Sequence, residues 1–124
     1  MKTHVSLRVS DLKSSAAFYQ KLGLAIKREV KLAKFSTDLV FLEASPNFEL
    51  ELVYNWDNNR KPELKDGYLH LGLEVKDMES FLQELKAKGI EPLCPVNILP
   101  GGGKMCFVVD PDGYQVELME HARK

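Results

Sequence analysis

The stretch HVSLRVSD at residues 4–11 decides the fold, because it returns as HLGLEVKD at residues 70–77. The two copies are 66 positions apart (70 − 4 = 66), and the same offset brings Glu51 onto Glu117 without a gap. Further identities at this offset pair Leu7 with Leu73, Val9 with Val75, Asp11 with Asp77, Ser14 with Ser80, Gly23 with Gly89, Phe41 with Phe107, and Leu52 with Leu118. The chain therefore consists of two copies of one module.

Each copy opens with a strand and a helix. Residues 4–9 and 70–75 alternate between apolar and polar side chains, which is typical of half-buried strands. An aspartate then stands where a helix N-cap belongs, and the following residues have helical spacing of apolar side chains up to a glycine. The predicted N-caps are Asp11 and Asp77, the helices are 12–22 and 78–88, and the terminating glycines are Gly23 and Gly89.

Each helix is followed by further strands. Apolar and β-branched stretches separated by turn residues predict strands at 38–44, 48–56, 104–109 and 114–120, with one more near 25–35 and near 90–98. We predict an α+β fold of two tandem βαβββ modules forming curved half-barrel sheets. The repeats, about 1–58 and 67–124, make one domain over residues 1–124, with a polar linker at 58–67 and a flexible glycine loop at 97–104.

Composition excludes several functional classes. The 124 residues carry a net charge of −1 with scattered Lys and Arg, so we expect no nucleic-acid partner. No apolar run reaches the roughly 18–20 residues of a membrane span, and we find no export signal at the N-terminus. Cys94 and Cys106 lack the spacing of a metal or redox motif and read as reduced thiols. We expect a cytoplasmic protein.

The repeat points to a metal site. Side chains alternate across a strand, so His4 and Glu51 fall on the polar face of the first module, and His70 and Glu117 on that of the second. A single histidine or glutamate on a strand is usually structural, but both recur at one offset. Two imidazoles and two carboxylates suit Zn²⁺, Ni²⁺, Co²⁺ or Mn²⁺. Without a thiolate this is no structural zinc clasp, and an octahedral ion would keep two open positions.

Four motifs carry a resemblance to a known family. They are THVSLRVSDLKSSAAFYQKLG (3–23), ELELVYNW (49–56), GYLHLGLEV (67–75) and DPDGYQVELME (110–120). Over essentially its full length the chain resembles glyoxalase I (lactoylglutathione lyase) of the vicinal-oxygen-chelate superfamily. The resemblance implies isomerisation of the methylglyoxal–glutathione hemithioacetal to S-lactoylglutathione, with His4, Glu51, His70 and Glu117 as metal ligands.

The resemblance also implies individual roles. Glu117 would be the principal base, with Glu51 as its pseudo-symmetric counterpart. Arg8 and Asn55 match positions where the family contacts the thiol, and Lys104 lies near its basic substrate loop. The compact length is similar to that of bacterial forms, which implies one divalent ion per site, Ni²⁺ in preference to Co²⁺ or Zn²⁺.

Assembly and substrate stay open at this point. The resemblance implies a homodimer in which His4 and Glu51 of one chain face His70 and Glu117 of the other, but pairing within one chain is also compatible with the sequence. The thiol need not be glutathione. Alternatives are another metal-dependent enzyme of the superfamily (a thiol transferase or a CoA-thioester epimerase) and a metal-free small-molecule binding module.

Overall fold

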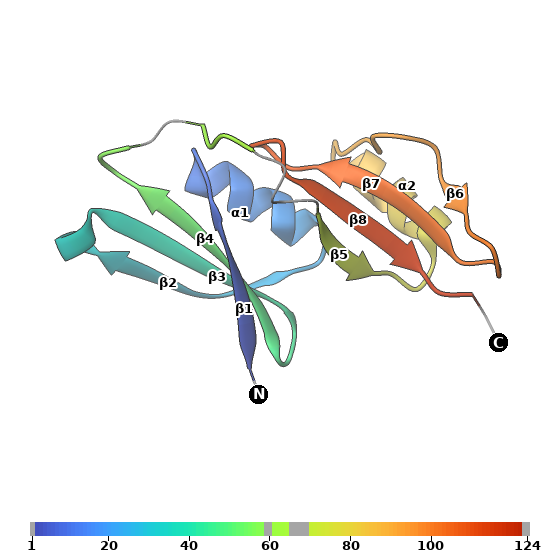
Figure 1. The fold of residues 1–124 in the computed structure, drawn as a ribbon, viewed down its shortest axis with the longest axis horizontal. Helices are drawn as coiled ribbons and strands as arrows, with labels where there is room; N and C mark the ends of the chain where they lie inside the picture. The colour runs from blue at the N-terminus through green and yellow to red at the C-terminus, as the bar shows by residue number, and fades with distance from the viewer. Residues whose placement is uncertain (1, 59–60, 65–69, 123–124) are drawn as a thin grey trace. The chain divides into compact units, whose positions relative to one another are not determined.

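The computed structural model describes residues 2–58, 61–64 and 70–122 (Figure 1). The chain divides into two compact units, Met1–Glu63 and Leu64–Lys124, which we call the first and the second unit. Residues 59–60 and 65–69 lie outside the described residues, so the predicted linker at 58–67 is described only at 58 and 61–64.

The first unit contains one sheet and one α-helix. Its elements are β1 (Thr3–Arg8), α1 (Leu12–Lys21), β2 (Ala25–Leu32), the short 3₁₀ turn η1 (Ala33–Phe35), β3 (Thr37–Ser45) and β4 (Phe48–Asn55). The strands are ordered β1-β4-β3-β2, with β1 parallel to β4 and the other pairs antiparallel (Figure 1).

The second unit repeats this topology. Its elements are β5 (Leu71–Glu74), α2 (Met78–Ala87), β6 (Asn97–Ile98), β7 (Lys104–Val109) and β8 (Gln115–Glu120). Their order is β5-β8-β7-β6, again with the first strand parallel to the last and the others antiparallel. The predicted α+β fold of two βαβββ modules is confirmed.

The helix boundaries follow from their caps. The Asp11 carboxylate accepts hydrogen bonds from the backbone N–H groups of Lys13 and Ser14, and the Asp77 carboxylate accepts one from Ser80. These bonds satisfy N–H groups that have no partner inside a helix. Gly23 and Gly89 adopt positive φ of 108° and 86° just past the helix ends, a conformation that glycine enters without strain.

The second unit differs from the expectation on its edge. The strand expected near 90–98 is only two residues long, Asn97–Ile98. Pro92 and Pro95 lack the N–H group that a strand ladder needs, while the Leu93 N–H between them donates to Phe107 O at 2.7 Å. The glycine loop expected at 97–104 is shorter in the structure, because Asn97–Ile98 form β6 and Lys104 begins β7. The hairpin turn between these strands covers residues 99–103 and is closed by the bond from Leu99 N to Gly103 O.

One face of each sheet is apolar and lies against the helix of its own unit. In the first unit Leu7, Leu50 and Leu52 are buried and α1 packs on β3 and β4. In the second unit Val116 and Leu118 are buried and α2 packs on β8. The opposite face of each sheet is left to carry the polar side chains.

Candidate active site

His70 and Glu117 lie together on the polar face of the second unit. His70 directly precedes β5. Glu117 lies on the neighbouring strand β8, where it is the register partner of Gly72 on β5. His70 Nε2 is 3.6 Å from Glu117 Oε1. Two donors bound to one ion at about 2.1 Å each lie about 3.0–3.4 Å apart, so this pair is within a few tenths of an ångström of ligand spacing.

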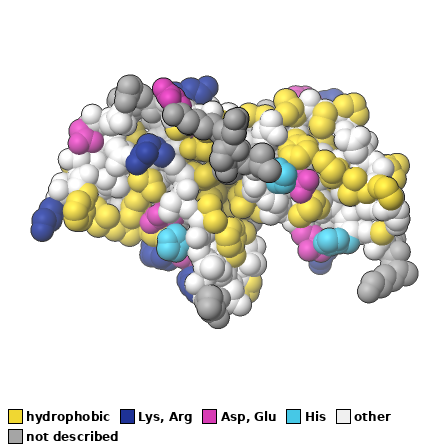
Figure 2. Space-filling view, in the orientation of Figure 1, with side chains coloured by type: hydrophobic (Ala, Val, Ile, Leu, Met, Phe, Trp, Pro, Cys, Tyr) yellow, Lys and Arg dark blue, Asp and Glu magenta, His cyan; other side chains and the backbone are white. Residues whose placement is uncertain are grey.

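His4 and Glu51 share the equivalent face of the first unit. His4 lies two residues before Ser6 on β1, and Ser6 is the register partner of Glu51 on β4. The Ser6 hydroxyl donates a hydrogen bond to Glu51 Oε1. Figure 2 shows that histidine side chains lie next to acidic ones on the face drawn there.

An aromatic ring accompanies each His–Glu pair. Phe41 is the register partner of Glu51 and meets the His4 ring edge-on at 6.4 Å between ring centres. Phe107 holds the same position in the second unit: it is the register partner of Glu117, and its ring centre lies 5.3 Å from that of His70. Both phenylalanines were visible as identities in the repeat, but their contact with the histidines required the strand register.

The two glutamates differ in the residue beside them. Glu51 is held by the Ser6 hydroxyl, whereas the position equivalent to Ser6 in the second unit is Gly72 (6 + 66 = 72). A Cβ built on Gly72 would lie 3.7 Å from Glu117 Oε1. The first glutamate is therefore braced by a neighbouring side chain, and glycine provides no such side chain at the second.

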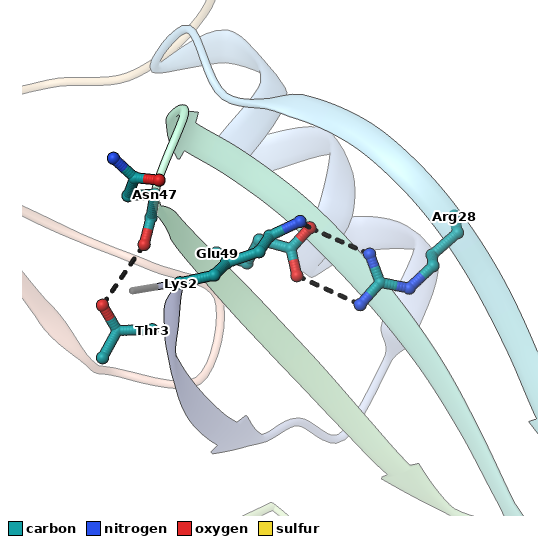
Figure 3. A network of polar contacts seen from close by, with 5 residues as sticks. All are labelled: Lys2, Thr3, Arg28, Asn47 and Glu49. Carbon is teal, nitrogen blue, oxygen red and sulfur yellow. Dashed lines mark hydrogen bonds and ion pairs between the residues drawn. The ribbon is translucent and has the colours of Figure 1, made fainter.

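Sequence reasoning missed a buried carboxylate next to the site. Glu49, the register partner of His4, is only 3% exposed. It accepts two hydrogen bonds from the Arg28 guanidinium at 2.9 and 3.0 Å, and Lys2 Nζ lies 3.1 Å from Glu49 Oε2 (Figure 3). Alternation along β4 places Glu49 on the same face as Glu51, but no sequence signal linked it to Arg28 on β2.

The cluster of Lys2, Arg28 and Glu49 holds a positive charge beside the candidate ligands. The Arg28 guanidinium lies 3.9 Å from the centre of the Phe41 ring, a cation–π contact. Hydrogen bonding by Arg28, and then by Lys2, lowers the pKa of Glu49 to about 2 against the opposing effect of burial. Its hydrogen bonds to Glu49 raise the pKa of Arg28. Glu49 is a charged anchor for two basic side chains.

The predicted thiol-binding residues lie on both units. On the first unit Arg8 Nε donates a 2.8 Å hydrogen bond to Asn55 Oδ1, on the same face as His4 and Glu51. On the second unit Lys104 begins β7, and its Nζ lies 3.9 Å from Glu120 Oε2. Arg8 and Asn55 are thus brought together, while Lys104 lies at the end of the hairpin turn beside an acidic residue.

Each unit carries one His–Glu pair whose donor types a divalent ion accepts. An imidazole nitrogen and a carboxylate oxygen on each unit are the donors that Zn²⁺, Ni²⁺ and Co²⁺ accept. Within the described residues, no group of three or more His, Cys, Asp or Glu side chains lies close enough to hold a metal by itself. Each His–Glu pair therefore supplies two candidate donors on its own unit.

The fold and the site define a class of protein. Residues 3–118 match the model of the Glyoxalase/Bleomycin resistance protein/Dioxygenase superfamily, and the chain belongs to this superfamily. Within it, the chain is similar to the lactoylglutathione lyase of Escherichia coli O157:H7. The two are 34% identical over 122 residues, which are 94% of this chain and 90% of the relative.

Solved structures agree with this placement. Glyoxalase I from Zea mays superposes with a TM-score of 0.87 at 27% identity over 98% of this chain, which spans 44% of the maize chain. The trypanothione-dependent glyoxalase I of Leishmania major superposes with a TM-score of 0.78 at 30% identity, covering 97% of this chain and 86% of that one. The resemblance found in the sequence is confirmed. Among the described residues, no helix has the length and apolar character needed to cross a membrane.

Proposed function

We propose that the chain is a lactoylglutathione lyase that isomerises the hemithioacetal of methylglyoxal and glutathione to S-lactoylglutathione, and so removes methylglyoxal. The observation that carries the proposal is the duplicated His–Glu pair, in a chain 34% identical to a lactoylglutathione lyase over almost its full length. The two units act together as one catalytic domain.

His4, Glu51, His70 and Glu117 would hold the metal ion, and we propose that this ion is Ni²⁺, with Co²⁺ or Zn²⁺ as alternatives. When bound, a divalent ion supplies Lewis-acid stabilisation of negative charge on the two adjacent oxygens of the substrate. The 3.6 Å separation of His70 Nε2 and Glu117 Oε1 supports this assignment for the second unit. The shared face of His4 and Glu51 supports it for the first.

Glu117 takes the proton from C1 of the substrate and returns it to C2. The unequal surroundings of the two glutamates support this division of roles. Glu51 accepts the Ser6 hydrogen bond, which favours a fixed carboxylate, while Glu117 faces Gly72 and is not held by that position. A general base contributes about 10²–10⁴-fold to the rate.

Arg8 and Asn55 hold the thiol part of the substrate, and Lys104 contacts it from the hairpin between β6 and β7. An arginine suits a carboxylate because its planar fork donates two parallel hydrogen bonds. The protein forms a homodimer and works in the cytoplasm, a compartment in which the thiols of Cys94 and Cys106 stay reduced.

The first test is metal-dependent turnover. Protein stripped of metal and reloaded separately with Ni²⁺ and Zn²⁺ is mixed with methylglyoxal and glutathione, and thioester formation is followed by absorbance. We expect Ni²⁺ to restore activity. Glu117→Gln should keep bound metal, measured by elemental analysis, and lose at least about 10²-fold in kcat.

Two results would contradict the proposal. Glu117→Gln that is fully active with metal bound would exclude Glu117 as the base. Stoichiometric metal binding without thioester formation for any metal would exclude this substrate and favour another metal-dependent reaction of the superfamily.

A further inference from the structure

A row of hydrogen bonds runs behind Arg8 across three strands of the first unit. Arg8 Nε on β1 donates to Asn55 Oδ1 on β4 at 2.8 Å, and Asn55 Nδ2 donates to Thr37 Oγ1 on β3 at 3.0 Å. The Thr37 hydroxyl in turn donates to the backbone carbonyl of Phe35 at 2.8 Å. The row connects the predicted thiol-binding pair to the turn η1.

The direction of every bond in this row is determined by chemistry. Arginine can only donate, so the Asn55 side chain must turn its oxygen toward Arg8 and its amide nitrogen toward Thr37. That nitrogen can only donate, so the Thr37 oxygen accepts. Its own hydrogen must then go to the Phe35 carbonyl, which can only accept. Reversing any one bond would leave two donors or two acceptors facing each other.

The far end of the row is fixed to the backbone. Thr37 is 7% exposed and is the register partner of Asn55, so its side chain lies inside the sheet surface. Between Phe35 and Thr37, Ser36 adopts a left-handed conformation with φ of 50°, and its carbonyl accepts a 2.8 Å bond from Trp56 N. The turn is thereby held to the residue that follows Asn55 in sequence.

The second unit lacks this row at the equivalent positions. The offset of 66 places Glu74 at the position of Arg8, His121 at that of Asn55, and Gly103 at that of Thr37 (8, 55 and 37 + 66). His121 Nε2 lies 3.5 Å from Glu74 Oε2, so a side-chain pair is present there too. Its anionic member takes the place of the arginine, and glycine supplies no hydroxyl behind it.

We propose that Thr37 is a positioning residue for recognition of an anionic thiol. Through Asn55 it fixes the plane of the Arg8 guanidinium, which then meets a carboxylate of the substrate's thiol part. Only the first unit can bind the substrate carboxylate in this way, because the second unit has Glu74 at the position of Arg8. This inference rests on the proposed function, since it assumes that the hemithioacetal binds beside His4 and Glu51.

The test compares Thr37→Val, which removes the hydroxyl at nearly constant volume, with Thr37→Ser, which keeps it. Metal-loaded protein is assayed with hemithioacetals of glutathione and of 2-mercaptoethanol, a thiol without a carboxylate. Binding of S-methylglutathione, which carries both carboxylates and does not react, is measured by calorimetry. The Arg8 Nε–H resonance is followed by NMR and assigned from its absence in Arg8→Lys.

For Thr37→Val we expect KM with glutathione and Kd for S-methylglutathione to rise about 3- to 10-fold, the loss of one hydrogen bond. Its kcat, and its KM with the mercaptoethanol adduct, should not change. The Arg8 Nε–H should lose protection from exchange, and Thr37→Ser should restore wild-type values throughout.

Other patterns would overturn the inference. An equal rise in KM for both adducts, or failure of Thr37→Ser to restore binding, would mean that Thr37 acts only through stability. A wild-type protein that binds S-methylglutathione but turns over neither adduct would overturn the proposed function and leave the role of Thr37 standing. A wild-type protein that does not bind S-methylglutathione would overturn the role of Thr37.

Discussion

The residue beside each candidate glutamate distinguishes two side chains that the repeat makes equivalent. The repeat alone identified His4, Glu51, His70 and Glu117, because all four are identities at one offset. It also exposed the difference between Ser6 and Gly72, but the meaning of that difference required the register that places each of them opposite its glutamate. The roles assigned to these four residues stay predictions.

Gly72→Ser should give Glu117 the brace that Glu51 has. The new Cβ would lie 3.2 Å from the flexible Met119 Cε, which can move, and 3.7 Å from Glu117 Oε1. A hydrogen bond to the carboxylate weakens it as a base, so we expect kcat to fall about tenfold with metal affinity retained. Steady-state kinetics and a metal titration measure the two effects. Gly72→Ala is the control for added volume, and an equal loss in Gly72→Ala would contradict the prediction.

Glu49 should make stability depend on acid pH. Its pKa is lowered in the folded protein from about 4.5 to about 2, so the folded state favours the carboxylate. Its contribution is complete above pH 4.5 and is lost as the pH falls toward 2. In urea unfolding of the metal-free protein, we expect wild type to lose its advantage over Glu49→Gln within this range.

The exposed helix residue Glu84 provides the matched control, as Glu84→Gln. A constant difference between wild type and Glu49→Gln from pH 6 to pH 2 would show that Glu49 stabilises the fold without its charge.

At the scale of the element, the alternation of apolar residues and the capping residues predicted most of the strands and helices in the structure. Strict alternation identified the strands, and aspartate and glycine marked both helices, because caps and positive-φ positions depend on local chemistry. The edge strand of the second unit was overestimated, since Pro92 and Pro95 remove the donors on which pairing depends. The ion pair between Arg28 and Glu49 joins β2 to β4, which are not neighbours in the sheet. No local sequence pattern could therefore predict it.

The cap of α1 gives a prediction at this scale. Asp11→Ala leaves the backbone N–H groups of Lys13 and Ser14 without their acceptor and should lower the free energy of unfolding by about 0.5–2 kcal/mol. Asp11→Asn keeps an acceptor oxygen and should lose little. Thermal and urea unfolding of both variants measure the difference, and equal losses in the two would exclude capping as the cause.

At the scale of the whole molecule, the central question is which halves make one site. The sequence predicted the two modules because duplication is visible within one chain. It could not predict their partners, since the same His–Glu half-sites can meet within a chain or between chains. That choice depends on how modules associate, which is not encoded in the pattern of either one.

Mixing two inactive variants addresses this question. One variant has both first-unit ligands removed (His4→Ala and Glu51→Ala), and the other both second-unit ligands (His70→Ala and Glu117→Ala). If sites form between chains of a homodimer, subunit exchange creates one dimer site with all four ligands. We expect metal binding and turnover to reappear on mixing. Sites within single chains would leave every site damaged, and the mixture would stay inactive.

The serine–glycine difference beside the glutamates also bears on how the two halves diverged. A duplicated module starts with two interchangeable carboxylates, yet in the proposed reaction Glu117 is the base while Glu51 is held by Ser6. A serine in one copy and a glycine in the other would separate these duties while all four proposed ligands are retained. Exchanging the two residues should therefore exchange the duties, so that proton transfer would begin from the opposite side of the same substrate. The stereochemistry of the reaction would then depend on which copy of the module carries the serine and which carries the glycine.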